Sequence, residues 1–184
     1  MTAIASKAQL RMSLLRYALV TVPLVLLLGT ASGRIAGSGD GNRWFDALAK
    51  PDIMPPGWVF GAAWTLLYIL LGLALAMLLH ARGARWRGAA IALFMVQLAL
   101  NLAWPPLFFA FHEVGWALAL IGAMIVGTVV LAVLAWWIRK RAALLLLPYL
   151  AWLCFAALLT AEILRLNPDA GGLVPQPAST DIVL

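Results

Sequence analysis

The chain has 184 residues, of which 65% are hydrophobic and 11% are charged, and its mean hydropathy is +0.98. Soluble globular domains carry about 25% charged residues, so the composition excludes an ordinary soluble domain. Several apolar runs reach the roughly 20 residues that a helix needs to cross a bilayer. The sequence therefore predicts an all-α, polytopic membrane protein. We therefore interpret the net charge of +6 as a determinant of membrane topology, and we expect no nucleic-acid partner.

Five apolar runs predict a bundle of five transmembrane helices. They follow a polar arm at residues 1–13 and cover residues 14–35, 56–79, 89–111, 115–138 and 142–164. The longest connection, residues 36–55, is rich in Gly, Asp and Pro. The membrane domain is expected to cover residues 14–166, and the tail at residues 167–184, with three prolines and two glycines, is expected to be flexible.

Charged residues divide unequally between the two ends of this predicted bundle. One end would carry nine cations: Lys7, Arg11, Arg16, Arg82, Arg85, Arg87, Arg139, Lys140 and Arg141. The other end would carry four, Arg34, Arg43, Lys50 and Arg165, together with all seven acidic residues. The positive-inside rule then places the N-terminus in the cytoplasm. We expect a multi-pass protein, with the cytoplasmic membrane favoured.

The first apolar run also has features of a cleaved secretory signal peptide. A basic start precedes the apolar stretch 17–28, and the small residues Thr30, Ala31, Ser32 and Gly33 follow it. Cleavage would leave four spans with the same charge bias, so charge alone does not decide the matter. We expect a retained helix because the cations of the arm join the basic end.

Three of the predicted helices each carry one face of aromatic and polar side chains. In the second, Trp64 and Tyr68 share a face with Gly57, Gly61 and Gly72, by i, i+4 and i+7 spacing. Gly57 and Gly61 form a GxxxG pair, which is most simply explained by helix packing. Trp58 fits the interfacial belt, whereas Trp64 and Tyr68 lie deeper.

The third helix has the equivalent face Gln97, Asn101, Trp104 and Phe108. Amides near the middle of a membrane are costly unless they face the bundle interior and are partnered. Interhelical hydrogen bonds of roughly 1 kcal/mol each are the simplest role for them. Pro105 and Pro106 lack the N–H groups that would bond to the carbonyls of Asn101 and Leu102, so these two carbonyls are left free. Because two amides and two free carbonyls are concentrated here, a ligand pocket is an equal alternative to purely structural hydrogen bonds.

The fifth helix supplies Tyr149, Trp152, Ala156 and Thr160. If the three faces converge, they enclose an apolar cavity suited to a flat hydrophobic ligand such as a porphyrin or a sterol. The loop around Lys50 would cover its mouth.

Signals for catalysis or metal binding are weak. The sequence has no Ser/His/Asp arrangement, phosphate-binding glycine loop or metal-ligand spacing, so we assign no catalytic residue and no metal site. His80 and His112 are expected at solvated helix ends. Cys154 is expected to be a buried thiol, and Glu162 is expected to pair with Arg165.

Three stretches resemble motifs of the TspO/translocator family, also called the tryptophan-rich sensory protein or peripheral benzodiazepine receptor family. WFDALAKPDIMPPGWVFGAAWTLLY (44–68) is similar to the family's long-loop and second-helix motif. QLALNLAWPPLFF (97–109) is similar to its third-helix motif, and PYLAWLCFAALLTAEILRLN (148–167) to its fifth. The resemblance covers about residues 14–167, and three ordered motifs make it highly specific.

The resemblance implies a five-helix bundle, often a homodimer, that binds porphyrins, sterols and synthetic isoquinoline or benzodiazepine ligands between the long loop and the bundle. It implies no required cofactor, and a porphyrin, protoporphyrin or heme-like, would be the ligand. Family members also occur in outer membranes. The family positions that match are Trp44, Pro55, Trp64, Gln97, Asn101, Trp104 and Trp152, and Trp64 and Trp152 are expected to flank the ligand.

Five residues depart from the family pattern. Phe45 replaces a usual tyrosine, and Asp52-Ile53 replaces a segment that often carries tryptophan, which could alter loop closure. Thr160 replaces a usual asparagine. Ala161 stands where the cholesterol-recognition motif has tyrosine, which weakens the case for sterol recognition there.

The leading hypothesis is a porphyrin-binding membrane protein of tetrapyrrole handling, sensing or stress response. One alternative is a transporter of such ligands, although no inverted repeat suggests alternating access. Another is an enzyme that degrades bound porphyrin under light, with tryptophans taking part in electron transfer. Ligand uptake into liposomes and product formation would separate these alternatives from binding alone.

Overall fold

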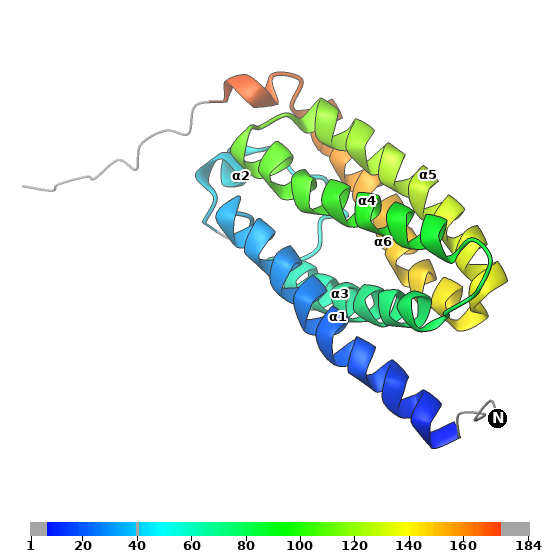
Figure 1. The fold of residues 1–184 in the computed structure, drawn as a ribbon. Coiled ribbons are helices and arrows are strands. Elements are labelled where there is room, and N and C mark those ends of the chain that lie inside the picture. Colours follow the sequence, from blue (N-terminus) through cyan, green and yellow to red (C-terminus); the bar gives the residue numbers. More distant parts are fainter. Residues whose placement is uncertain (1–6, 40, 174–184) are drawn as a thin grey trace, which may run out of the picture.

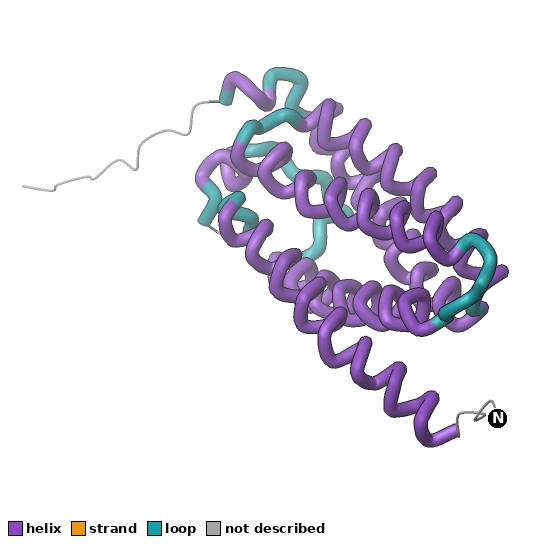
Figure 2. The backbone as a smooth tube through the Cα atoms, viewed as in Figure 1, coloured by secondary structure: helices purple, strands orange, loops and turns teal. Residues whose placement is uncertain are grey.

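The structure, a computed structural model that describes residues 7–39 and 41–173, is a bundle of five long helices (Figure 1). These helices are α1 (Lys7–Ile35), α3 (Gly57–His80), α4 (Arg87–Pro105), α5 (Val114–Ile138) and α6 (Lys140–Leu166). Two short elements lie between them, α2 (Arg43–Ala47) and the π-helix η1 (Pro106–Ala110), and the 3-10 helix η2 (Ala170–Gly172) follows α6. Throughout the described ranges the chain is helix or loop (Figure 2), with five segments long and apolar enough to span a membrane. The predicted all-α, five-span architecture is confirmed.

The five long helices form a ring in which α1 packs on α3, α3 on α6, α6 on α5, α5 on α4, and α4 on α1. The core is apolar, but the outward faces are apolar as well, with Leu19, Val126 and Leu158 exposed. Helices that are hydrophobic all round are expected where lipid covers the outside of a bundle. The ring packs α3 on α6, and α3 also contacts α4, although α6 is remote from both helices in the sequence.

The start of α1 and the long loop differ from the sequence prediction. α1 begins at Lys7 rather than at residue 14, so part of the predicted polar arm is helical. The long loop contains α2, which the sequence pattern did not predict. Asn42 caps this helix by accepting a hydrogen bond from the Phe45 N–H (2.9 Å), and asparagine is a favoured residue at that position. Of the predicted flexible tail, residues 174–184 lie outside the described residues.

Close packing of α1 on α3 depends on Gly29 and Gly72. The Tyr68 ring fills the space beside Gly29, and a Cβ on Gly72 would lie 2.6 Å from the Val22 Cα. Thr21 Oγ1 reinforces the contact by donating to the Gly72 carbonyl at 2.7 Å. Gly61, in contrast, has open space beside it. Gly57 and Gly61 are both exposed, so the GxxxG pair does not make the close contact between α1 and α3. Gly72, further along the same helix, makes it instead.

The Pro105-Pro106 pair changes the helix that contains it. α4 ends at Pro105 and continues as the π-helix η1, because two consecutive residues lack the N–H that a helix needs. The carbonyl of Leu102, freed by Pro106, accepts a hydrogen bond from Ser32 Oγ at 2.6 Å. One of the two free carbonyls predicted for a ligand thus ties α4 to α1.

At the end of the bundle that contains the α3–α4 connection, basic side chains form hydrogen bonds with neighbouring helices. Arg82 Nη2 donates to Tyr17 Oη (2.7 Å), and this hydrogen bond raises the pKa of Arg82. Arg87 donates to the last carbonyls of α3, and Arg139 Nη2 lies 3.1 Å from His80 Nδ1. His80 is thus part of an interhelical contact rather than only a solvated helix end.

Two further predictions from the sequence have different outcomes. Glu162 and Arg165 do pair, with Arg165 Nη2 2.7 Å from Glu162 Oε2. Cys154, predicted to be buried, is exposed on α6. An apolar stretch in a membrane helix faces lipid as readily as core, so its hydrophobicity does not predict burial.

Candidate functional site

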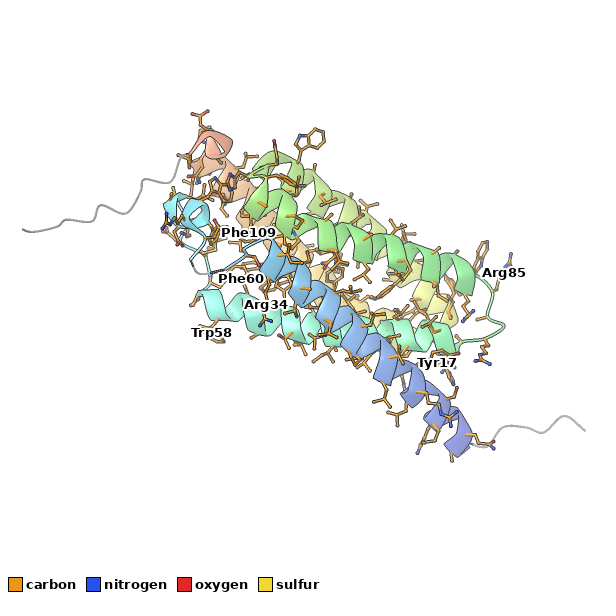
Figure 3. All side chains as sticks on the ribbon, turned by 60° about the vertical axis from the view of Figure 1, so that its left-hand side comes forward. Tyr17, Arg34, Trp58, Phe60, Arg85 and Phe109 are labelled. Carbon is orange, nitrogen blue, oxygen red and sulfur yellow. The ribbon has the colours of Figure 1, made fainter. Side chains whose placement is uncertain are left out.

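The aromatic faces of α3 and α6 meet in a cluster of rings, which we call the mid-bundle cluster: Trp64, Tyr68, Tyr149 and Trp152. Trp64 is central, with its ring centroid 5.2 Å from Tyr68, 6.5 Å from Tyr149 and 6.3 Å from Trp152. Phe60 extends the cluster toward the α2 end (Figure 3), with its centroid 5.8 Å from Trp152. The α3 and α6 faces predicted to converge therefore do so.

Asn101 joins α4 to this cluster through the two tyrosines. Tyr68 Oη donates to Asn101 Oδ1 at 3.2 Å, and Asn101 Nδ2 donates to Tyr149 Oη at 3.1 Å. All three side chains are buried. This chain of hydrogen bonds satisfies polar groups that would otherwise be costly inside a membrane, and it fixes the relative positions of α3, α4 and α6.

Gln97 does not join the ring cluster, although it lies one turn before Asn101. Its Nε2 donates to the Met124 carbonyl (2.7 Å) and to Thr128 Oγ1 (2.6 Å), both on α5. The amide occupies the space beside Gly127, where a Cβ would lie 2.5 Å from Gln97 Oε1. Gln97 thus makes the interhelical hydrogen bonds that were its simplest predicted role.

Trp104 and Phe108 belong to a second group of rings, which we call the loop-end cluster: Trp44, Phe45, Trp104, Phe108, Phe109 and His112. Trp104 stacks on Phe108 with centroids 5.0 Å apart, and its indole Nε1 donates to the Ala117 carbonyl at 3.2 Å. Trp44 is 2% exposed, packs edge-on against Phe108 (5.4 Å), and donates from Nε1 to the Ala170 carbonyl at 2.8 Å.

His112 belongs to this cluster although the sequence predicted only a solvated helix end for it. Its ring stacks on Trp44 with centroids 4.2 Å apart, and its φ of 59° lies in the left-handed region. The backbone turns sharply between η1 and α5 at this point, which places the ring over Trp44. Nothing in the sequence pairs the two residues, because the contact joins the loop before α3 to the turn after η1.

The long loop is fastened to the end of α6 by Asn167. Asn167 Oδ1 accepts from the Ala49 N–H (2.9 Å), and Nδ2 donates to the Ala49 carbonyl (2.9 Å) and to the Ile163 carbonyl (2.8 Å). Lys50 lies over the Phe45 ring, 4.8 Å from its centroid. Pro55 is half-buried after an exposed turn at Asp52-Ile53, so this departure from the family pattern lies on the outer surface of the loop.

The space between the helices at Asn101 is small. A cavity of about 10 Å³ is lined by Gln97, Asn101 and Tyr149 together with the apolar residues Leu71, Phe94, Leu98, Leu131 and Leu146. That volume is about what one water molecule needs. The aromatic rings that were expected to line a porphyrin-sized cavity instead contact one another in this structure.

The mid-bundle cluster has chemistry suited to binding flat apolar molecules. Trp64 and Trp152 are half-buried, and within the described chain neither indole N–H donates a hydrogen bond. Rings that can separate would present their faces to a planar ligand, and Asn101 offers an amide beside them. Residues 7–39 and 41–173 contain no group of His, Cys, Asp or Glu placed to hold a metal ion.

Comparison with known proteins identifies the family. The profile of the TspO/MBR family matches residues 20–166. The Translocator protein of Bos taurus is 39% identical over 146 residues, which cover 76% of this chain and 84% of that protein. Protein CrtK of Rhodobacter capsulatus is 32% identical over 139 residues, covering 75% and 85%. The Tryptophan-rich sensory protein of Cereibacter sphaeroides is 36% identical over 126 residues, covering 68% and 78%. The five-span bundle and these matches together show that the chain belongs to the TspO/MBR family of integral membrane proteins.

Proposed function

We propose that this protein binds a porphyrin, or a similar flat hydrophobic molecule, between the rings of the mid-bundle cluster and beneath the long loop. The observation that carries the proposal is the position of Trp64. It contacts Tyr68, Tyr149 and Trp152 from two helices, yet it is half-buried and its indole N–H has no hydrogen-bond partner in the described chain. Such a ring can stack on a ligand without breaking a hydrogen bond of the protein.

Ligand entry requires the protein to open. The cavity of about 10 Å³ beside Asn101 is far smaller than the few hundred Å³ that a drug-sized ligand needs. The loop is held by Asn167 and by the buried Trp44. We expect the Ala49–Asn167 contact to open first, because it consists of hydrogen bonds in a partly exposed position, whereas Trp44 also has rings on two sides.

Residues from both clusters have roles in this proposal. Trp64 and Trp152 flank the ligand, Tyr68 and Tyr149 form the floor with Asn101, and Pro55 and Phe45 belong to the covering loop. The covering loop and the helices around the ligand are held in place by Trp44, Trp104, Phe108 and Gln97. The homodimer and the physiological role in tetrapyrrole handling remain predictions.

The experiment measures quenching of tryptophan fluorescence as protoporphyrin is added to the purified protein. We expect Trp64→Ala combined with Trp152→Ala to weaken binding at least tenfold, since loss of aromatic stacking removes on the order of 1 kcal/mol per ring pair. The matched control is Trp116→Ala combined with Trp137→Ala, which removes two exposed tryptophans of α5. Equal affinity of the two double variants would rule out the mid-bundle cluster as the binding site.

The same preparations test the alternative functions. Porphyrin uptake into liposomes that depends on the protein would indicate transport. A product formed under light, and lost with Trp64→Ala, would indicate degradation. Binding without either result would leave binding or sensing as the function.

A further inference from the structure

The end of the bundle opposite α2 is basic and lacks acidic partners. It includes the α3–α4 connection and the α5–α6 junction, and Figure 3 shows Arg85 there, far from Phe109. Every acidic side chain in the described ranges lies at the other end: Asp46, Asp52, Glu113, Glu162 and Asp169. The positive charge at this end is therefore not neutralised by described residues of the chain.

Some of these cations are used to hold the helices together, and others are not. Arg82, Arg87 and Arg139 make the interhelical hydrogen bonds described above. Arg85 and Lys140 form neither an ion pair nor a hydrogen bond within the described ranges, and each instead lies over an exposed tryptophan. The Arg85 guanidinium is 4.9 Å from the Trp86 centroid, and Lys140 Nζ is 5.2 Å from the Trp136 centroid.

These two cation–aromatic pairs lie at the same end of neighbouring helices. Trp86 is the residue before α4, Trp136 is in the last turn of α5, and the two helices pack along each other in opposite directions. Both rings are about half exposed, at 53% and 45%. Tryptophan with adjacent Lys or Arg is the combination that occurs where a membrane protein meets lipid headgroups.

The backbone at Trp86 adds an independent observation. Its φ is 67° and its ψ is 0°, a left-handed conformation that is strained for a bulky residue. Glycine would adopt it without steric cost, yet this position carries a large ring that remains exposed. Strain of this kind is concentrated at positions that serve a function.

We propose that the pairs Arg85/Trp86 and Lys140/Trp136 form a binding site for the headgroup of an anionic phospholipid. The phosphate would lie between the two cations and the rings at headgroup depth. The acyl chains would follow the exposed apolar faces of α4 and α5, which include Met95, Val96, Val130 and Val133. Basic pockets between transmembrane helices are known sites for anionic lipid headgroups. This site is separate from the mid-bundle cluster and does not depend on the proposed porphyrin binding.

The test uses the full-length protein reconstituted in vesicles of equal phosphatidylcholine and phosphatidylglycerol and then extracted in mild detergent. Mass spectrometry measures the ratio of the two retained lipids. We expect phosphatidylglycerol to be enriched, and Arg85→Gln combined with Lys140→Gln to lower the enrichment roughly 25-fold, since each cation near an anionic surface contributes about fivefold. The matched control, Lys50→Gln combined with Arg165→Gln, removes two cations from the other end and should leave the enrichment unchanged.

Trp86→Gly separates lipid binding from folding. Because glycine relieves the strained backbone, we expect this variant to keep its thermal stability while losing enrichment, whereas Trp116→Ala should keep both. Equal losses in the two cation variants would indicate a general surface charge and overturn the site. Displacement of phosphatidylglycerol by a soluble acidic peptide, at an ionic strength where the lipid is otherwise retained, would indicate a protein partner and also overturn it.

Discussion

The two aromatic clusters contain similar residues but are held in different ways. In the loop-end cluster, Trp44 and Trp104 donate their indole N–H groups to backbone carbonyls, and Trp44 is almost fully buried. In the mid-bundle cluster, Trp64 and Trp152 make ring contacts only and stay half-buried, while the tyrosines beneath them are fixed by Asn101. The comparison indicates that a tryptophan count does not locate a ligand site. The indole hydrogen bonds distinguish tryptophans tied to the backbone from tryptophans held by ring contacts alone.

The largest expected effect comes from replacing one tryptophan in each cluster. Trp44→Ala should lower the free energy of unfolding by about 3–5 kcal/mol, because it leaves a large buried cavity and an unpaired Ala170 carbonyl. Trp64→Ala should lower it by about 1–2 kcal/mol, because a half-buried ring leaves a smaller cavity. Unfolding of both variants in mixed detergent micelles measures the difference. If Trp64→Ala were the more destabilising, the distinction between the two clusters would fail.

A smaller effect is expected at the contact that fastens the loop. Asn167→Ala removes three hydrogen bonds, two to Ala49 and one to Ile163, at a cost of about 1 kcal/mol each. Hydrogen exchange at the Ala49 amide should become faster, and protoporphyrin should associate faster, since the covering loop opens more often. Stopped-flow fluorescence measures the association rate.

Thr160→Ala is a matched control, because the Thr160 hydroxyl bonds only within α6, to the Ala156 carbonyl. An unchanged association rate in Asn167→Ala would show that the ligand does not enter beneath this loop.

The smallest expected effect is at the hydroxyl groups of the mid-bundle cluster. Tyr149→Phe removes the acceptor for Asn101 Nδ2, and Tyr68→Phe removes the donor to Asn101 Oδ1. Each should cost about 0.6 kcal/mol, the average for hydrogen bonds between membrane helices. The double variant should cost less than the sum, because Asn101 can reorient once both partners are lost. A double-mutant cycle followed by thermal unfolding measures this coupling, and strict additivity would show that the three side chains do not act as one network.

The sequence predicted the faces of α3 and α6 correctly, but it was less successful for α4. Trp64, Tyr68, Tyr149 and Trp152 meet as the i, i+4 spacing indicated. Gln97 and Trp104 fall on the same nominal face as Asn101, yet both bond to α5. The side chains on this face spread over enough of the helix circumference that Asn101 reaches across the bundle to α3 and α6, whereas Gln97 and Trp104 reach α5. The π-helix after Pro105 rotates Phe108 further.

Composition and the length of the apolar runs determined the class of protein, the number of helices and their approximate bounds. These properties are local, since a run of apolar residues forms a membrane helix whatever surrounds it. Tertiary structure alone decided that Ser32 donates a hydrogen bond to the Leu102 carbonyl, that His112 stacks on Trp44 and that Asn167 bonds to the loop at Ala49. Each of these contacts joins residues far apart in the chain, and their partners depend on the order of the helices in the ring. Hydrophobic periodicity does not encode that order, because large apolar residues occur on both the outer and the inner faces of these helices.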